Sequence, residues 1–302
     1  RATSKQKALP MTLATEIQPI APGGPLLQGV TDEEFSLFST LIYQKTGIQI
    51  SSRKQTLLSN RLRRRLRSTG IGGFADYYQQ LKRLPANDPE WDAFLQEITT
   101  HETYLFRDEA QWTWFRTVYL PERGAARGAG LGSAPLRIWS AACSTGDEAY
   151  TTACCIAACL PGFREGRASI LGTDIGLGAL AEARRATFGD RAMRLVPPEY
   201  RRAFFLETEP GRVWRAKPVL SGMITFRQHN LMTRLSDRPF DLVFLKNVLI
   251  YFDAVSKRRA IDNLLPMVRP GGMLVVGASE GVSDLLRGLV RIQPWLYRRP
   301  QA

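Results

Sequence analysis

The stretch WSAACSTGDEAY, residues 139–150, decides how the rest of the sequence is interpreted. After a hydrophobic lead-in comes a loop of Ala, Cys, Ser, Thr and Gly that ends at Gly146, followed by two acids and a helix-forming run. Small residues between a strand and the next helix let backbone amides approach a bound ligand closely. The stretch therefore predicts a ligand site at the end of the first strand of an α/β sheet.

The C-terminal part of the chain, residues 136–302, alternates strand-like and helical segments. The strand-like runs are LRIWSA (136–141), SILGTD (169–174), ITFRQ (224–228), DLVFLKN (241–247) and MLVVGAS (273–279). Such alternation predicts a mostly parallel, doubly wound α/β sheet of the Rossmann-like kind, with ligands at the carboxyl ends of its strands. Pro and Gly interrupt this rhythm at about 197–226, where we expect a small β insertion.

Residues 30–100 show helical periodicity. Thr31 can cap a helix with an acidic first turn, and Leu37, Leu41 and Ile42 give that helix an apolar face. Three more helices are expected at about 54–67, 74–84 and 91–98. The segment predicts a small all-α N-terminal domain.

Two other segments complete the expected organisation. Residues 1–29 combine four prolines with the pair Gly23-Gly24 and lack any periodicity, which predicts a flexible tail. Residues 101–135 are expected to connect the domains, with a helix from about Asp108 to Tyr119 and then the Gly/Ala-rich loop RGAARGAGLGSAP.

The composition narrows the class of protein. A formal net charge of +13 predicts an acidic partner, which could be nucleic acid, anionic lipid or a glutamate-rich protein. No apolar run reaches the roughly 18 residues of a membrane-spanning helix, and the N-terminal region lacks the apolar core of a secretory signal. We therefore expect a cytoplasmic protein without a transmembrane segment.

Cysteine and histidine usage argues against a metal site. All four cysteines lie between Cys143 and Cys159, with spacings that match neither a zinc site nor a disulfide framework, so we expect buried, reduced thiols. His101 and His229, the two histidines of the sequence, are far apart along the chain. A histidine-based metal site is therefore not expected.

The residues around the small-residue loop indicate which ligand it holds. A single glycine is too few for the dinucleotide fingerprint, and no Gly-Lys-Ser/Thr run follows for a P-loop. Asp147 and Glu148 suit a cationic ammonium or sulfonium group, although acids are also common in a first helical turn. Asp174, at the end of the second strand-like run, can accept hydrogen bonds from ribose hydroxyls.

Asn230 and Asn247 follow the third and fourth strand-like runs, where each could equally be an ordinary turn residue. Taken together, a small-residue loop, an ammonium-matching acid, a ribose-matching acid and nearby amides describe S-adenosylmethionine as the cofactor, with S-adenosylhomocysteine as its product.

The chain also resembles the CheR-type chemotaxis receptor methyltransferases, which methylate glutamates of bacterial chemoreceptors. The resemblance runs from about Thr31 to Arg299 through LIYQKTGI, NRLRRRLR, TTHETYLFRD, IWSAACSTGDEAY, NVLIYFD and VRPGG. It implies that the partner is the acidic helical methylation region of a chemoreceptor. We expect the protein to act on membrane-bound receptors as a monomer.

The resemblance implies roles for particular residues. Arg107 and Tyr251 would face the reacting methyl group and the substrate carboxylate. Cofactor contacts are implied at His101, Thr103, Arg107, Glu148, Asp174, Asn230, Leu231, Asn247 and Val248. The sequence departs from the family pattern at His101 (usually Asn), Asp147 (Glu), Ala149 (Pro), Lys246 (Arg) and Ala278 (often His).

The implied reaction requires alignment of its reactants. A glutamate has an ordinary pKa of about 4.3 and is already ionised at pH 7, so methyl transfer from a sulfonium needs no general base. Arg107 could hold the acceptor carboxylate, and Tyr251 could line the path of the methyl group. Without the resemblance, Arg107 would be interpreted as a surface arginine and Tyr251 as a core aromatic.

The second expected helix carries a basic stripe. Leu58, Leu62 and Leu66 predict a buried face, which turns Arg61, Arg64, Arg65 and much of Arg67 outward. Residues 54–67 contain no acid, whereas a solvated face usually mixes signs. We interpret Arg61, Arg64 and Arg67 as substrate-binding residues, with a plain solvated surface as the alternative.

Two other functions are compatible with parts of the sequence. A nucleic-acid methyltransferase would explain the charge, but the fourth strand-like run leads into KNVLIYF where an Asn/Asp-Pro-Pro-aromatic motif would be expected, and no aromatics interleave the basic helix. No nucleic-acid partner is therefore expected. A cofactor-binding signalling or docking protein without catalysis is compatible with the departures at His101, Lys246 and Ala278, but not with retention of Arg107, Glu148, Asp174 and Tyr251.

Overall fold

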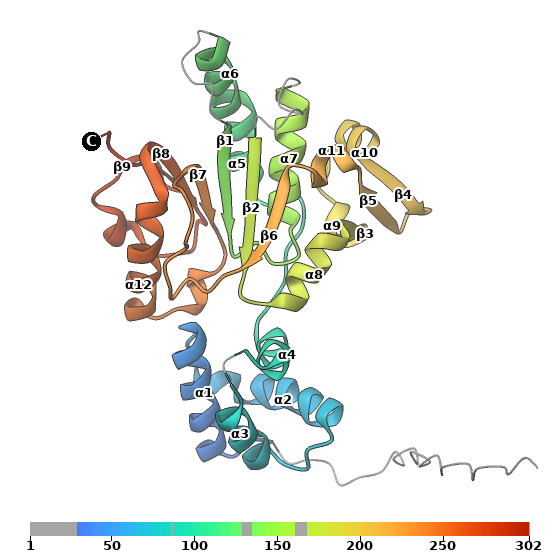
Figure 1. The fold of residues 1–302 in the computed structure, drawn as a ribbon, viewed down its shortest axis with the longest axis vertical. Helices are drawn as coiled ribbons and strands as arrows, with labels where there is room; N and C mark the ends of the chain where they lie inside the picture. The colour runs from blue at the N-terminus through green and yellow to red at the C-terminus, as the bar shows by residue number, and fades with distance from the viewer. Residues whose placement is uncertain (1–28, 86, 129–134, 161–167, 302) are drawn as a thin grey trace, which may run out of the picture.

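The computed structural model describes residues 29–85, 87–128, 135–160 and 168–301. The predicted tail therefore lies almost entirely outside the described residues. Four N-terminal helices form one body, and a central sheet with its helices forms a second (Figure 1). Strand β1 runs toward the helical body, so the carboxyl ends of the parallel strands meet it (Figure 1).

The N-terminal body consists of helices and one short 3-10 turn. Its elements are α1 (Asp32–Thr46), η1 (Ser52–Lys54), α2 (Gln55–Thr69), α3 (Phe74–Arg83) and α4 (Pro89–Ile98). Thr31 caps α1 in a capping box with Glu34, which satisfies two backbone N–H groups at that end. The expectation for Leu37 is wrong, because this side chain is 43% exposed and Phe38 faces the core instead.

The connecting segment is more helical than predicted. It contains α5 (Glu109–Trp114), a π-helical turn η2 (Phe115–Tyr119) and α6 (Leu120–Gly128). The first half of the predicted Gly/Ala-rich loop is therefore helix, since its Ala and Arg residues are good helix formers. The second half, residues 129–134, falls outside the described residues.

A seven-stranded sheet forms the centre of the second body, in the order β6-β2-β1-β7-β8-β10-β9. Neighbouring strands from β6 to β8 are parallel, and β10 and β9 add two antiparallel strands. The strands are β1 (Leu136–Ala141), β2 (Ala168–Asp174), β6 (Ile224–Gln228), β7 (Phe240–Leu245), β8 (Val268–Val276), β9 (Val290–Gln293) and β10 (Leu296–Arg298). The expectation of a mostly parallel α/β sheet is confirmed.

Alternate side chains of each central strand pack in two different hydrophobic clusters, one on each face of the sheet. In β7, Leu242 and Phe244 pack in one hydrophobic cluster, while Val243 and Leu245 pack in the other. The helices and turns around the sheet are α7 (Asp147–Cys159), α8 (Leu177–Arg185), η4 (Leu249–Tyr251), α12 (Ala254–Leu264), η5 (Leu265–Met267) and η6 (Ser283–Leu286). Cover on both faces is the doubly wound arrangement.

The predicted β insertion is present but begins earlier. A three-stranded antiparallel sheet has the order β3-β5-β4, formed by β3 (Thr187–Gly189), β4 (Phe205–Glu209) and β5 (Val213–Ala216). Short helices α9 (Asp190–Met193), α10 (Pro198–Phe204) and α11 (Pro218–Ser221) surround it. The first strand was missed because three residues are too few to show alternation.

Candidate active site

A cavity lies at the carboxyl edge of the sheet, where the helical body covers it, and its roughly 1010 Å³ of empty space includes the part that is open to solvent. Thr46 and Ile48 from the helical body line it together with residues that follow β1, β2, β6 and β7. All ten predicted cofactor-binding and catalytic residues are among the lining residues: His101, Thr103, Arg107, Glu148, Asp174, Asn230, Leu231, Asn247, Val248 and Tyr251. The fold thus brings positions from four strands and the connecting segment into one site.

The floor of the cavity is the small-residue loop. Ala142, Ser144 and Gly146 all have positive φ angles, which turn the chain sharply after β1. A side chain at Gly146 would meet Ala183 Cβ at 2.9 Å, because α8 and Phe226 pack against the loop. The residues are therefore small for two reasons, since the chain turns tightly and neighbouring elements approach it.

Asp174 fixes the shape of this loop from the end of β2. Its Oδ2 atom accepts the backbone N–H of Ser144 at 2.8 Å, and its Oδ1 atom accepts the N–H of Gly176 at 3.0 Å. Each carboxylate oxygen has a second acceptor site. Asp174 can therefore hold the loop and still accept hydrogen bonds from a ligand in the cavity.

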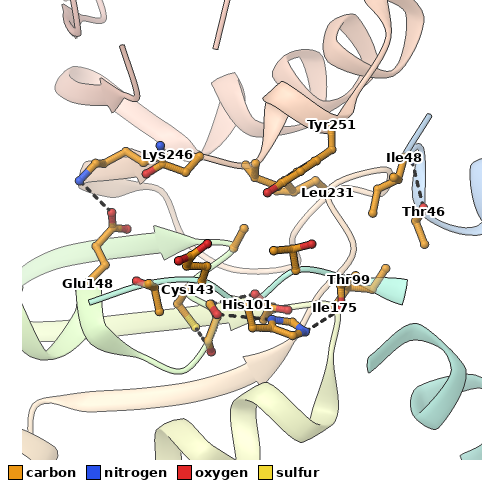
Figure 2. Close-up of a pocket in the computed structure, with 18 of the residues that line it drawn as sticks. Thr46, Ile48, Thr99, His101, Cys143, Glu148, Ile175, Leu231, Lys246 and Tyr251 are labelled. Atoms are coloured by element: carbon orange, nitrogen blue, oxygen red, sulfur yellow. Dashed lines mark hydrogen bonds and ion pairs between the residues drawn. The ribbon is translucent and has the colours of Figure 1, made fainter. Parts of the chain in front are cut away.

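Glu148 faces the cavity with its charge already paired. Its Oε2 atom lies 3.4 Å from Lys246 Nζ (Figure 2). Its Oε1 atom accepts the hydroxyl of Ser140 at 2.7 Å. The Lys246 side chain is only 3% exposed and also lies 3.1 Å from Asp108 Oδ2. Two carboxylates share one lysine, so the group keeps a net negative charge that favours a cationic ligand.

His101 joins the helical body to the loop. The hydroxyl of Thr99 donates to Leu95 O, so it accepts from His101 Nε2, 2.6 Å away. This arrangement leaves Nδ1 to accept the Ser144 hydroxyl at 3.4 Å. Burial lowers the pKa of His101, despite the opposing influence of Asp174 and Glu182, and therefore favours the neutral ring.

Two of the other candidates also carry structural contacts. Asn230 Nδ2 donates to Lys45 O at 2.7 Å, which ties the segment after β6 to α1. Asn247 has a positive φ of 57°, so the chain turns directly after β7 and presents Val248 and Tyr251 to the cavity. Figure 2 shows Lys246, Leu231 and Tyr251 on one side of the cavity, opposite Cys143, His101 and Ile175.

A second groove adjoins the cavity. Ile48, Thr99, Thr100 and Tyr251 line both spaces, and the groove continues past Lys54, Leu57 and Arg61 along α2. The ammonium of Lys54 lies 5.8 Å from the centre of the Tyr251 ring. The groove therefore leads from a basic surface to the aromatic side chain that borders the cavity.

Two models of known protein families match this chain. The model of the CheR methyltransferase SAM-binding domain matches residues 101–291, and that of the CheR methyltransferase all-alpha domain matches residues 33–99. The chain belongs to the CheR methyltransferase family. The resemblance inferred from the sequence is confirmed, as are its class of fold and its cofactor, S-adenosylmethionine.

Two chemotaxis protein methyltransferases agree with the family models. The chemotaxis protein methyltransferase of Escherichia coli strain K12 is 33% identical over 262 residues, which cover 85% of this chain and 87% of the relative. Chemotaxis protein methyltransferase 2 of Pseudomonas aeruginosa is 32% identical over 266 residues, covering 86% and 91%. The solved N-methyltransferase NodS of Bradyrhizobium japonicum WM9 is 17% identical over 63% of this chain and 92% of its own, with a TM-score of 0.36.

The basic stripe of this CheR methyltransferase differs from the expectation. Arg65 is not turned outward, because its side chain is 16% exposed and paired with Glu90 of α4. Arg61 is half-buried and donates to Ile98 O and, at 2.9 Å, to the hydroxyl of Thr100. Arg64 and Arg67 are exposed, and Arg64 lies 2.7 Å from Glu97. Acids therefore do reach this face, supplied by α4 and not by α2 itself.

Arg107 lies at the rim of the same cavity. Its Nη1 atom donates to Glu102 O at 3.1 Å, and its guanidinium lies 5.7 Å from the centre of the Tyr104 ring. The side chain is only half-buried. It can therefore turn toward an incoming carboxylate at the cost of one exposed hydrogen bond.

Sequence reasoning missed His229, which also lines the cavity. Its ring packs at 60° against Trp139, 5.9 Å between ring centres, and its position directly after β6 was a usable signal. The two histidines therefore share a cavity despite their separation along the chain. Within the described ranges, no group of three or more His, Cys, Asp or Glu side chains could hold a metal ion.

The cysteines agree with the sequence-based expectation of buried thiols, except for Cys159. Cys143, Cys154 and Cys155 are buried free thiols and Cys159 is half-buried. Burial raises the pKa of the Cys143 and Cys154 thiols, which keeps them protonated and unreactive. None of the helices in the described part of the chain is both long and apolar enough to cross a bilayer.

Proposed function

We propose that this CheR methyltransferase transfers the methyl group of S-adenosylmethionine to glutamate carboxylates in the acidic helical methylation region of a chemoreceptor. The observation that carries the proposal is the continuity of two spaces: the cavity at the sheet edge and the groove along α2 share Tyr251, Thr99 and Thr100. A donor in the first space and an acceptor from the second would meet at Tyr251.

The cofactor is held by the residues that follow the strands. Asp174 would accept hydrogen bonds from the ribose hydroxyls, and Glu148, beside Lys246, would face the cationic amino-acid end. Val248, Leu231 and the amide of Asn247 would surround the base. When bound, S-adenosylmethionine supplies the activated methyl group.

The protein's task in the reaction is alignment. The acceptor glutamate is ionised at neutral pH, so no side chain has to remove a proton. Arg107 would hold the acceptor carboxylate and Tyr251 would exclude water from the path of the methyl group. Orientation of this kind can contribute roughly 7 to 11 kcal/mol to lowering the barrier.

The acceptor is recognised by charge. Arg64 and Arg67 are exposed on α2, and Lys54 and Arg61 border the groove. A receptor helix that displays glutamates would align along this surface, with rapid association favoured by opposite charge. The protein would act as a monomer in the cytoplasm, at the membrane-bound receptor.

A separate receptor tether is not part of this proposal. The connection between β4 and β5 is only Pro210–Arg212, with Gly211 at a φ of 66°. A peptide can be gripped by adding a strand to an exposed sheet edge, and the family resemblance implies a longer, glycine-rich turn here in members that hold a receptor tail in this way. The shortness of this turn supports methylation without a tether.

The test is transfer of labelled methyl groups to receptor-containing membranes. We expect label on the receptor that is released as methanol by mild base, the behaviour of a carboxyl ester, and no transfer to added DNA or RNA. Absence of receptor labelling, or label that resists base, would reject the proposed acceptor.

A further inference from the structure

Glu280 is a buried acid that the proposed reaction does not use. It lies in the turn after β8, it is 1% exposed, and it is not among the residues that line the cavity. Its Oε1 atom accepts the backbone N–H of Asn247, while its Oε2 atom makes no hydrogen bond to any residue that the structure describes. A carboxylate is costly to bury, so its retention here calls for a physical reason.

The segment 247–251, whose first residue donates its backbone N–H to Glu280, carries three of the site residues. Strand β7 ends at Leu245, Asn247 turns the chain with a positive φ, and a single 3-10 turn follows at Leu249–Tyr251. Asn247, Val248 and Tyr251 all line the cavity. Asparagine tolerates this conformation better than most non-glycine residues, and a hydrogen bond to its backbone N–H helps to fix the turn.

Glu280 provides that support through backbone amides. Besides the hydrogen bond from Asn247 N–H, the backbone N–H groups of Leu249, Val248 and Ile250 act to lower the pKa of this carboxylate. Burial nonetheless raises the pKa of Glu280, against the lowering effect of those four amides. The free N–H groups at the start of a short helical turn are the groups that a carboxylate satisfies best.

The turn that carries Glu280 is itself anchored on two sides. Gly277 N–H donates to Leu245 O at 3.3 Å, and Lys257 Nζ of α12 donates to Glu280 O at 2.7 Å. A side chain at Gly277 would place its Cβ 2.6 Å from Glu280 Oε1 and 3.2 Å from Asn247 N. Glycine at this position therefore leaves the space that the contact needs.

We propose that Glu280 is a positioning residue, whose buried carboxylate fixes residues 247–251 in the geometry that binds the cofactor and presents Tyr251 to the acceptor. The inference rests on the proposed function of the cavity. It assigns part of the support of this cavity wall to a side chain that does not line the cavity, beside the hydrogen bond from Gln49 N–H to Tyr251 O.

Asp241 offers a matched comparison, because it lies at the start of β7, at the opposite end of that strand from Asn247. It is also a buried acid, and it accepts the backbone N–H of Arg137 at 2.8 Å and pairs with Arg269 at 2.6 Å. It lies away from the carboxyl edge of the sheet. Its loss should reduce stability without reaching the cavity.

The experiment compares Glu280→Gln with Asp241→Asn in the full chain. Glutamine keeps one acceptor but turns an NH₂ group toward backbone donors, so the segment should shift. We expect Glu280→Gln to weaken S-adenosylhomocysteine binding about tenfold or more, the effect of losing a hydrogen bond to a charged group. The amides of residues 247–250 should exchange hydrogen faster, and Asp241→Asn should change neither quantity by more than about twofold.

Two outcomes would overturn the inference: wild-type affinity and exchange in Glu280→Gln, or an equal loss in Asp241→Asn. If Glu280→Gln does not fold, Gly277→Ala takes its place, because the added Cβ would displace the carboxylate. The same weakening of S-adenosylhomocysteine binding and the same faster hydrogen exchange are expected. S-adenosylhomocysteine binding and hydrogen exchange are measured without the receptor. Failure of this inference can therefore be told apart from failure of the proposed receptor methylation.

Discussion

The Oδ2 atom of Asp174 accepts the backbone N–H of Ser144 at 2.8 Å, so the acid that ends β2 holds the loop that follows β1. Through its Oδ1 atom the same carboxylate accepts the N–H of Gly176 at the start of α8. One side chain thus connects three elements at the floor of the cavity. Its removal should affect both the shape of the site and its ligand contacts.

Replacement of Asp174 by alanine should weaken cofactor binding by roughly 1.5 to 3 kcal/mol, the range for hydrogen bonds to a charged group. Calorimetric titration with S-adenosylhomocysteine measures this directly. Asp190→Ala, which removes an exposed acid on α9, is the control and should bind as wild type. Unchanged affinity in Asp174→Ala would remove Asp174 from the site.

Lys246→Met should destabilise the fold and the site together. The substitution leaves Glu148, whose side chain is 15% exposed, and the more exposed Asp108 without their shared cation. Because neither acid is fully buried, we expect a loss of about 1 to 3 kcal/mol, less than for a fully buried pair. Lys246→Arg keeps the charge and should retain most stability and activity. Chemical denaturation measures the free energy of unfolding, and a loss in Lys246→Met no greater than in Lys246→Arg would contradict the pairing argument.

Charge reversal on α2 should act on the acceptor and not on the cofactor. Arg64→Glu with Arg67→Glu should raise the KM for receptor about tenfold or more at low salt, while cofactor affinity stays constant. Wild-type activity should fall as salt rises. Arg61 is left intact, because its bonds to Ile98 and Thr100 make it part of the fold.

The matched control places the same charge change on α12, as Arg258→Glu with Arg259→Glu, where both arginines are exposed. This variant should methylate receptor nearly as wild type. If the two double variants lose activity equally, net charge and not the α2 surface governs association.

His229 makes stability depend on pH. Burial, with a smaller effect of Arg227, lowers the pKa of His229 to about 4, so the unfolded chain binds its proton first as pH falls. The contribution of His229 to the free energy of unfolding is therefore fully present above about pH 6.5 and is lost as the pH falls toward 4. For a half-buried ring we expect a loss of about 1 to 2 kcal/mol, after allowing for solvent screening.

His229→Gln should flatten this part of the stability profile. Unfolding midpoints measured between pH 4 and 8 should converge for the two proteins at acid pH and differ most above pH 6.5. Parallel profiles across the whole range would show that His229 does not titrate in this way.

The sheet and its site were predictable because local pattern and position determine them. The run LRIWSA coincides with β1, and Asp174 ends β2 as expected, since strand ends converge at one edge of a parallel sheet. Contacts between distant segments were not predictable. Arg65 meets Glu90 of another helix, and Glu280 meets Asn247, a pairing that depends on β7 and β8 lying side by side.

The most direct test of the proposed activity is a single-turnover reaction between this protein, one equivalent of S-adenosylmethionine and receptor membranes. The S-adenosylhomocysteine formed and the glutamate methyl esters on the receptor are quantified together by mass spectrometry. The proposed mechanism predicts equal amounts of both products, with esters confined to glutamates of the methylation region. The Arg107→Ala, Tyr251→Ala double variant should form only a small fraction of either product. Formation of S-adenosylhomocysteine without receptor esters, or methyl groups on other side chains, would contradict it.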